Sequence, residues 1–144
     1  MTQITLVCPA CSAVNRVPVE RVSHAPRCGA CHKPLFTAQP VPVDEASLVR
    51  HIRLNDIPVL VDIWAPWCGP CVSMAPYYEQ AAAQLEPHIR LLKLNADTAP
   101  QTMAKYSVRS IPSLLLFSAN KLKAQSAGAM TTAQITQWAR HHVA

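Results

Sequence analysis

The chain has 144 residues, half of them hydrophobic and 15% charged, so we expect one sizeable core, with room for a small appended module, and little disorder. Its formal charge of +5 is scattered along the sequence, which gives no reason to expect a nucleic-acid partner. Residues 1–7 lack the basic and apolar regions of a signal peptide. No segment approaches the roughly 18 apolar residues of a membrane helix. We therefore expect a cytoplasmic protein that does not bind membranes, in a compartment where thiols stay reduced.

Six cysteines form three pairs, and the two cysteines of each pair are separated by two residues. The first two pairs are Cys8/Cys11 and Cys28/Cys31, with sixteen residues between them. This spacing is typical of a tetrahedral zinc site made of four thiolates. His24 and His32 are alternative ligands in principle.

Residues 14–18 are expected to form a short strand between these pairs, and residues 34–36 could supply another. A segment of about 36 residues is too small to fold on its own core and usually needs a structural metal. We therefore divide the chain into a zinc-binding module at 1–36, a linker and edge strand at 37–43, and a main domain at 44–144.

The main domain alternates strands and helices. Asp44 is a candidate N-cap for the first helix, and the continuous apolar run at 59–64 predicts a strand buried on both faces. The expected elements are helix 45–54, strand 59–64, a helix from the third cysteine pair to about residue 85, strand 90–95, helix 98–106, strand 114–117, edge strand 123–128 and helix 132–142. This order predicts an α/β fold in which helices flank a central sheet.

The third pair, Cys68 and Cys71, lies where strand 59–64 gives way to a helix. Residues three apart in a first turn lie on one face, so a small tightening brings the two sulfurs to bonding distance. The helix N-terminus stabilises an anion and lowers the pKa of a thiol placed there. We expect Cys68 to be the exposed nucleophile and Cys71 the more deeply placed resolving thiol.

Asp62 is an acid within a strand that is predicted to be buried. Burial raises the pKa of a carboxyl group that finds no partner, and Asp62 could then carry the proton of Cys71. It could also pair with Lys93 on the neighbouring strand, and the two interpretations are compatible.

Aromatic residues lie on both sides of the cysteine pair in the sequence. We expect Trp64 in the core and Trp67 on the surface, as an apolar platform for a protein substrate. Met74 and Tyr77 are expected in the core of the helix.

The segment at residues 64–71, Trp-Ala-Pro-Trp-Cys-Gly-Pro-Cys, resembles the active-site segment of the thioredoxins. The resemblance covers about residues 40–144 and is supported by Asp62, residues 93–95, Tyr106, Ile111-Pro112 and residues 127–129. The four preceding cysteines resemble those of zinc-containing, type-two thioredoxins.

This resemblance implies a thioredoxin fold, a mixed central sheet flanked by helices, preceded by a zinc ribbon holding one structural zinc. It implies a protein-disulfide reductase that acts on disulfide-containing proteins through Cys68 and Cys71 and is reset by an external thioredoxin reductase. It also implies a cis Ile111-Pro112 bond facing Cys68. The residues that it places against substrate are Trp67, Gly69, Pro70, Ile111, Pro112 and Gly128.

The sequence departs from the thioredoxin pattern at three places: Val72 stands where a basic residue is usual, Ser110 replaces a glycine, and Asn120-Lys121 replaces an Asn-Gly turn. Two alternatives to the reductase hypothesis also remain. The chain could be an adaptor that binds protein or nucleic acid on an inert scaffold, or its zinc site could sense oxidants by releasing the metal.

Overall fold

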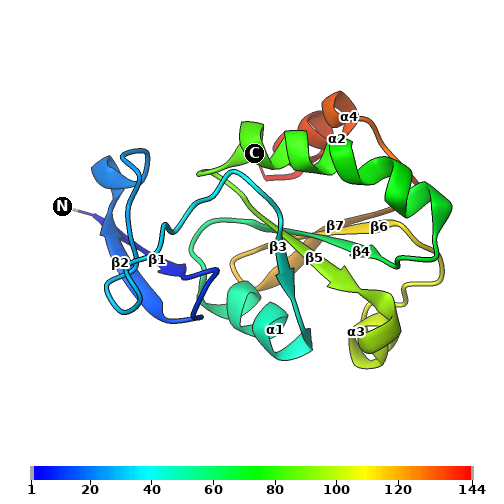
Figure 1. Cartoon of the computed structure of the whole chain (residues 1–144), viewed down its shortest axis with the longest axis horizontal. Coiled ribbons are helices and arrows are strands. Elements are labelled where there is room, and N and C mark those ends of the chain that lie inside the picture. Colours follow the sequence, from blue (N-terminus) through cyan, green and yellow to red (C-terminus); the bar gives the residue numbers. More distant parts are fainter. Residues whose placement is uncertain (1, 144) are drawn as a thin grey trace.

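The computed structural model describes residues 2–143 and contains two sheets (Figure 1). The smaller sheet is an antiparallel hairpin of β1 (Gln3–Val7) and β2 (Val14–Pro18), followed by one short 3-10 helix at Val19–Arg21. The strand expected at 14–18 is confirmed, and its partner β1 was not predicted. No strand forms at 34–36 in the described chain, where Pro34 makes only an isolated bridge to Arg27.

The larger sheet has five strands in the order β3-β5-β4-β6-β7. They are β3 (Val41–Val43), β4 (Val59–Trp64), β5 (Arg90–Asn95), β6 (Ser113–Ser118) and β7 (Lys121–Ala127). β3, β5 and β4 are parallel, whereas β6 and β7 are antiparallel to their neighbours. The mixed sheet expected from the sequence is therefore confirmed, with β4 at its centre.

Four α-helices cover the two faces of this sheet: α1 (Glu45–Leu54), α2 (Gly69–Leu85), α3 (Pro100–Lys105) and α4 (Thr132–Val143). A 3-10 helix at Ala96–Thr98 precedes α3. α1 and α3 lie on one face and α2 and α4 on the other (Figure 1). Successive residues of β4 point to opposite faces, so Val61 joins the first core and Leu60 the second.

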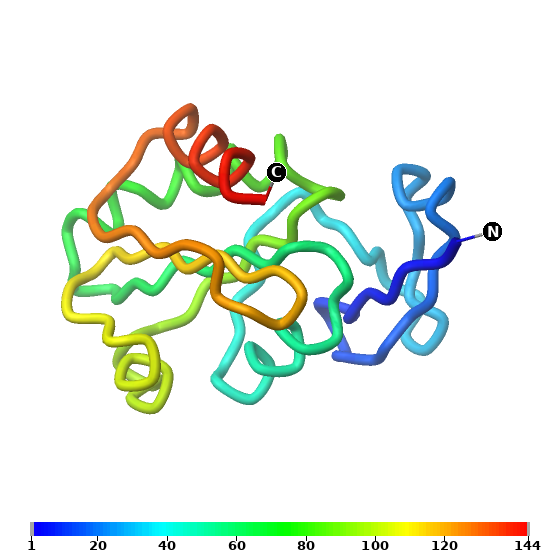
Figure 2. Tube along the Cα trace, turned by 180° about the vertical axis from the view of Figure 1, so that it is seen from behind, coloured from blue at the N-terminus to red at the C-terminus, as the bar shows by residue number. Residues whose placement is uncertain are grey.

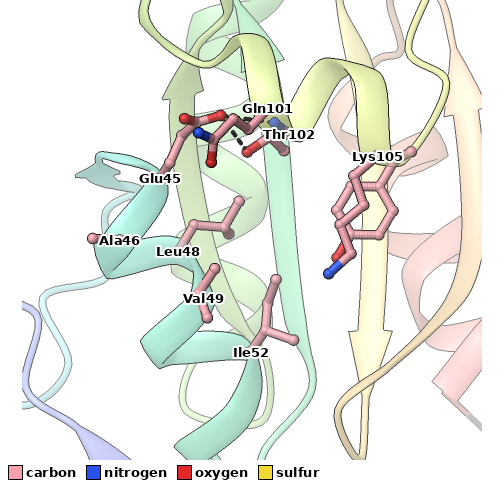
Figure 3. Close-up of a pocket in the computed structure, with 9 residues that line it drawn as sticks. Glu45, Ala46, Leu48, Val49, Ile52, Gln101, Thr102 and Lys105 are labelled. Atoms are coloured by element: carbon pink, nitrogen blue, oxygen red, sulfur yellow. Dashed lines mark hydrogen bonds between the residues drawn. The ribbon is translucent and has the colours of Figure 1, made fainter.

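Hydrogen bonds from side chains hold α1 in place at its N-terminus. The Asp44 carboxylate accepts a hydrogen bond from the Ser47 amide at 2.8 Å, which confirms the predicted cap. Glu45 accepts two hydrogen bonds from Thr102 of α3, at 2.7 Å from its amide and 2.9 Å from its hydroxyl. A groove of about 410 Å³ lies between the two helices (Figure 3).

Arg90, the first residue of β5, joins the small sheet to the large one. Its side chain is fully buried, and its Nη1 lies 3.0 Å from the Glu86 carboxylate, which is only 3% exposed. Its Nη2 donates to the carbonyl oxygens of Leu35 at 2.6 Å and Val7 at 3.5 Å, and its guanidinium stacks 4.7 Å from the Phe36 ring. One buried cation therefore contacts residues from both ends of the N-terminal module.

The free edge of β1 pairs with the turn that follows α1. Thr5 and Asp56 exchange two hydrogen bonds, at 2.6 and 2.9 Å, and the Val7 amide donates to the Asn55 side chain at 2.9 Å. Burial, followed by the charges of nearby arginines, lowers the pKa of His51 to about 4. His51 is therefore neutral, and its Nδ1 accepts from the Asn55 amide group at 2.8 Å.

We expect Arg90→Met to lower the free energy of unfolding by about 3 kcal/mol or more, because it leaves Glu86 buried without its partner. Urea denaturation measures this change, with Arg53→Met, an exposed arginine of α1, as the matched control. The double variant Arg90→Met/Glu86→Leu should recover part of the loss, since it removes both charges. Equal stabilities of Arg90→Met and Arg53→Met would contradict this role for Arg90.

Candidate active site and metal centre

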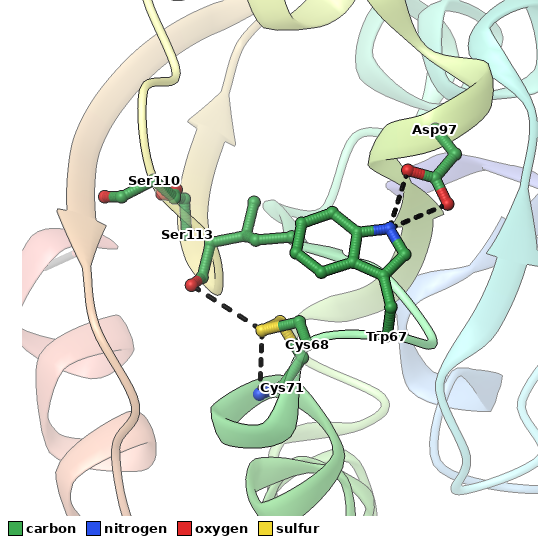
Figure 4. The surroundings of a disulfide bond; sticks show 7 residues. Trp67, Cys68, Cys71, Asp97, Ser110 and Ser113 are labelled. Atoms are coloured by element: carbon green, nitrogen blue, oxygen red, sulfur yellow. Dashed lines mark hydrogen bonds between the residues drawn. A yellow bond between two sulfur atoms is a disulfide. The ribbon is translucent and has the colours of Figure 1, made fainter.

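The third cysteine pair lies where β4 passes into α2. Cys68 is the N-cap of α2, and its Sγ accepts a hydrogen bond from the Cys71 amide at 3.2 Å. The two cysteines form a disulfide, with their Cα atoms 5.2 Å apart (Figure 4). A sulfur in this position faces the free amides and the positive end of the helix, which stabilise a thiolate when the disulfide is reduced.

Cys68 is less exposed than the sequence predicted. It is 6% exposed, against 1% for Cys71, because both pack in a small cluster with Ala65 that Ile111 contacts. Cys68 is nevertheless the sulfur nearer to solvent, so an incoming disulfide reaches it first.

The loop before β6 forms the opposite side of the site. The Ile111-Pro112 bond is cis, and the Ile111 carbonyl oxygen lies 3.7 Å from Cys68 Sγ. The Ser113 hydroxyl donates to the Ser110 carbonyl at 2.6 Å, and the Gly128 amide donates to the Pro112 carbonyl at 2.9 Å. These bonds bring the end of β7 against the loop that faces the disulfide.

Asp62 is buried in β4 without a partner. It is 1% exposed, and neither of its carboxylate oxygens has a hydrogen-bond partner among residues 2–143. Burial raises its pKa from 3.8 to about 7, and the charge of Lys93 offsets only part of this effect. Asp62 therefore gains and loses a proton close to neutral pH.

The alternative pairing of Asp62 with Lys93 is not formed. The two residues are neighbours in the β4–β5 register, yet the described chain shows no ion pair between them. Lys93 Nζ lies instead 4.3 Å from the centre of the Trp64 ring. Trp64 is half-buried rather than enclosed in the core, and the cation on its ring leaves the Asp62 carboxylate unneutralised.

The structure buries Tyr78 rather than Tyr77. Tyr77 is 44% exposed, whereas Tyr78 is fully buried because it lies seven residues, two helical turns, after Cys71. Its hydroxyl lies 2.7 Å from the Leu92 carbonyl and 3.2 Å from that of Leu60. The Tyr78 hydroxyl thus donates its only proton to backbone carbonyl oxygens of the sheet and has none to donate to Asp62. Helical periodicity counted from Cys71 and Met74 could have identified this residue.

Trp67 lies on the surface, as expected, and is 69% exposed. Its indole nitrogen donates to both carboxylate oxygens of Asp97, at 3.0 and 3.1 Å (Figure 4), and the Asn95 side chain in turn accepts from the Asp97 amide at 2.9 Å. Asp97 was not identified from the sequence, because no local pattern links it to a residue thirty positions earlier. Val72, directly after Cys71, is 53% exposed.

The first four cysteines come together in the N-terminal module. Their Sγ atoms all lie within 4.8 Å of one another, and the group consists of Cys8, Cys11, Cys28 and Cys31. Neither His24 nor His32 belongs to it. Four thiolates at such distances are the donor set of a tetrahedral metal site.

Hydrogen bonds to sulfur support this donor set. The Ala10 amide donates to Cys8 Sγ at 3.3 Å and the Ala30 amide to Cys28 Sγ at 3.4 Å. The Asn15 side chain donates to Cys28 Sγ at 3.4 Å and accepts from the Gly29 amide at 2.8 Å. The Cys31 amide and then Asn15 lower the pKa of Cys28 to about 6. Asn15 was not identified from the sequence as part of this site.

The metal centre and the redox pair lie far apart in the fold. Figures 1 and 2 place the N-terminal module, in blue, at one end of the molecule and the junction of β4 and α2 at the other. The four cysteines therefore do not share a site with Cys68 and Cys71.

None of the helices within residues 2–143 has the length and apolar character needed to cross a membrane.

Comparison with protein families gives two matches along the chain. The family model described as Thioredoxin matches residues 39–141, and the model described as Thioredoxin 2, N-terminal, matches residues 7–33. The second match contains all four clustered cysteines. The two matches together account for nearly the whole chain.

Individual relatives agree with these matches. Thioredoxin C-3 of Corynebacterium nephridii is 40% identical over 133 residues, which are 92% of this chain and 91% of the relative. Thioredoxin of Acidithiobacillus ferridurans is 44% identical over 94 residues, 65% of this chain and 87% of the relative. Thioredoxin 1 of Nostoc sp. is 37% identical over 101 residues, which are 70% of this chain and 94% of the relative.

The resemblance inferred from the sequence is thus confirmed along both parts of the chain. The disulfide between Cys68 and Cys71 fits the Cys-Gly-Pro-Cys active site that such proteins use. This chain therefore belongs to the thioredoxin family and is a thiol-disulfide oxidoreductase.

Proposed function

We propose that this protein reduces disulfide bonds in other proteins, with Cys68 as the nucleophile and Cys71 as the resolving thiol. The observation that carries the proposal is the closed Cys68–Cys71 pair at the start of α2, following a strand that holds the unpartnered carboxyl group of Asp62. This arrangement supplies an activated thiol, a second thiol and a proton acceptor.

The first step begins from the reduced pair. The Cys68 thiolate attacks one sulfur of the substrate disulfide, forms a mixed disulfide with it and releases the other substrate sulfur as a thiolate, which takes a proton from water. The amides at the start of α2 stabilise the Cys68 thiolate before the attack. Its position beside Ile111 leaves one side of Cys68 for the substrate.

The second step closes the pair. Cys71 transfers its proton to the ionised Asp62 carboxylate, directly or through a water molecule, and attacks Cys68 Sγ. The Cys68–Cys71 disulfide forms, the mixed disulfide breaks, and the second substrate sulfur leaves as a thiolate. Two electrons have then passed from the dithiol to the substrate. A carboxyl group with a pKa of about 7 suits this transfer, because it exchanges protons near physiological pH.

We assign substrate contact to the residues around Cys68. An extended substrate segment would pair with the backbone of Ile111, beside Pro112 and Gly128, and would lie against exposed Trp67. The remaining contacts would come from Gly69 and Pro70, which are both exposed at the start of α2.

The oxidised pair has to be reduced again before another turnover. We propose that an external thioredoxin reductase supplies the two electrons, because the sequence contains no glycine-rich motif for binding a flavin or nicotinamide cofactor. We also propose that the protein acts in the cytoplasm, because its four clustered cysteines are free of disulfides and thiols persist in that compartment.

The metal that we assign to the clustered cysteines is one structural zinc ion. Bound zinc would hold residues 1–36 together as a ribbon, with 37–43 as linker and edge strand and 44–144 as the thioredoxin domain. A structural role is supported by the buried contacts of this module with Arg90 and by its separation from the redox pair. The intact dithiol and Asp62 argue against an inert adaptor.

We expect Cys68→Ser to abolish turnover of a protein disulfide, because it removes the attacking thiolate. Cys71→Ser should retain the first step and accumulate a mixed disulfide, which mass spectrometry detects. Ser73→Ala, at an exposed position of the same helix, is the control and should turn over normally. Unchanged activity of Cys68→Ser would exclude the proposed mechanism.

The raised pKa of Asp62 predicts that stability falls as pH increases. The unfolded carboxyl group loses its proton near pH 4, but the folded one keeps it up to about pH 7, so the free energy of unfolding declines between these values. One pKa unit corresponds to about 1.4 kcal/mol, and the decline should therefore approach about 4 kcal/mol. Asp62→Asn should remove it.

Urea denaturation of the oxidised proteins at pH 5 and pH 8 should show about 3 kcal/mol of this decline, with Glu79→Gln as an exposed control. Asp62→Asn should also slow decay of the mixed disulfide, because Cys71 loses its proton acceptor. A variant that keeps both the wild-type pH dependence and the wild-type decay rate would show that Asp62 has neither role.

We expect about one zinc ion per chain, which a mercurial reagent releases and a colorimetric chelator counts. Metal removal or Cys28→Ser should lower the unfolding temperature, because the β1–β2 module loosens and exposes Arg90. Turnover of a small disulfide, measured below that temperature, should stay the same. If peroxide releases the zinc and turnover changes to the same extent, the result would instead support a zinc site that senses oxidants.

A further inference from the structure

An open groove of about 500 Å³ lies between the end of β7 and α4. We call it the α4 groove and define it by Gly128, Ala129, Met130, Gln137, Trp138 and His141, which are among the residues that line it. None of these residues is part of the dithiol centre. The groove begins at Gly128, the residue after β7, which meets the active-site loop.

The α4 groove is continuous with the edge of the redox site. The Gly128 amide bonds to the Pro112 carbonyl at 2.9 Å, and the preceding Ile111 carbonyl lies 3.7 Å from Cys68 Sγ. A peptide that pairs with the backbone of Ile111 therefore passes Gly128 next. From there the groove leads along α4.

The entrance to the groove is free of protein atoms. Gly128 has a φ of +105°, and a Cβ atom built on it would have no neighbour within 4 Å. β7 is also an edge strand of the sheet, and an edge presents backbone amide and carbonyl groups that an extended chain can use.

The chemistry of the lining suits an uncharged peptide. Met130 and Trp138 pack on the core beneath α2 and α4 and give the groove a firm apolar floor. Gln137 is exposed, and its side chain makes no hydrogen bond within the described chain, so its amide is free to bind a peptide backbone. Among residues 2–143 the lining contains no Asp, Glu, Lys or Arg, and its ionisable side chains are those of His141 and His142.

We infer that the α4 groove binds the extended, uncharged segment that flanks the reactive cysteine of a protein substrate. This inference rests on the proposed function and extends the substrate site from the loop at Ile111 to α4. Its consequence is specificity: protein disulfides use the groove, whereas a small disulfide reaches Cys68 without it.

The test is a variant that fills the groove from an exposed position, Gln137→Trp. Its matched control is Gln84→Trp, which makes the same change at an exposed position of α2 outside the groove. Reduction of insulin and of 5,5′-dithiobis(2-nitrobenzoate) is followed with dithiothreitol as the reductant, so that no reductase takes part. We expect kcat/KM of Gln137→Trp for insulin to fall about tenfold, in the range expected for a lost apolar contact.

The small disulfide should be reduced at the wild-type rate by both variants, and insulin at the wild-type rate by Gln84→Trp. An equal effect of Gln137→Trp on both substrates, or none on insulin, would overturn the inference. A defect seen only when a reductase supplies the electrons would assign the groove to the reductase instead. If the wild-type protein elutes as a dimer in size-exclusion chromatography and Gln137→Trp elutes as a monomer, the α4 groove would instead bind a second copy of the chain. Failure of the wild-type protein to reduce either disulfide would refute the proposed function itself.

Discussion

Strand β4 is buried on both faces at the centre of the sheet, and this burial determines the chemistry of the residues that follow it. Cores on either side exclude water from Val61 and Leu60. Asp62, the next residue of the strand and on the same face as Leu60, is 1% exposed and has neither solvent nor a hydrogen-bond partner among residues 2–143 to stabilise its charge. The same strand ends at Trp64, four residues before Cys68, the N-cap of α2. One buried strand thus fixes the position of the dithiol and raises the pKa of the acid that it carries.

Arg90 has a comparable role between the two parts of the chain. Burial of a guanidinium is costly unless its charge and its donors find partners. Here Glu86 supplies the opposite charge, and Val7 and Leu35 supply carbonyl oxygens to Nη2, whereas Nε has no hydrogen-bond partner among residues 2–143. The N-terminal module therefore completes the environment of a residue in the large sheet. The module thus contacts the start of β5, even though it lies at the other end of the molecule from the redox pair.

The sequence predicted features that depend on local pattern. Apolar runs and caps located every strand and helix of the main domain within a few residues, and cysteine spacing separated the four clustered thiols from Cys68 and Cys71. It did not predict contacts between distant residues, such as Asp97 with Trp67 or the pairing of β1 with β2. Lys93 shows the reason: register placed it beside Asp62, but rotamer choice directed its ammonium to Trp64.

Apart from Asp97 beside Trp67, the start of α2 and the segment from the end of β7 into α4 carry no charged side chain, and this limits how this face can select partners. Residues 66–77 and 124–139 contain no Asp, Glu, Lys or Arg, and Val72 places an apolar side chain where a basic one is usual in thioredoxins. Long-range charge steering, which speeds encounter and rejects partners of like charge, is therefore weak on this face. Discrimination has to come from shape, apolar contact and backbone hydrogen bonds after contact is made. Those interactions act through the dissociation rate more than the association rate, so substrates are distinguished by how long they stay beside Cys68.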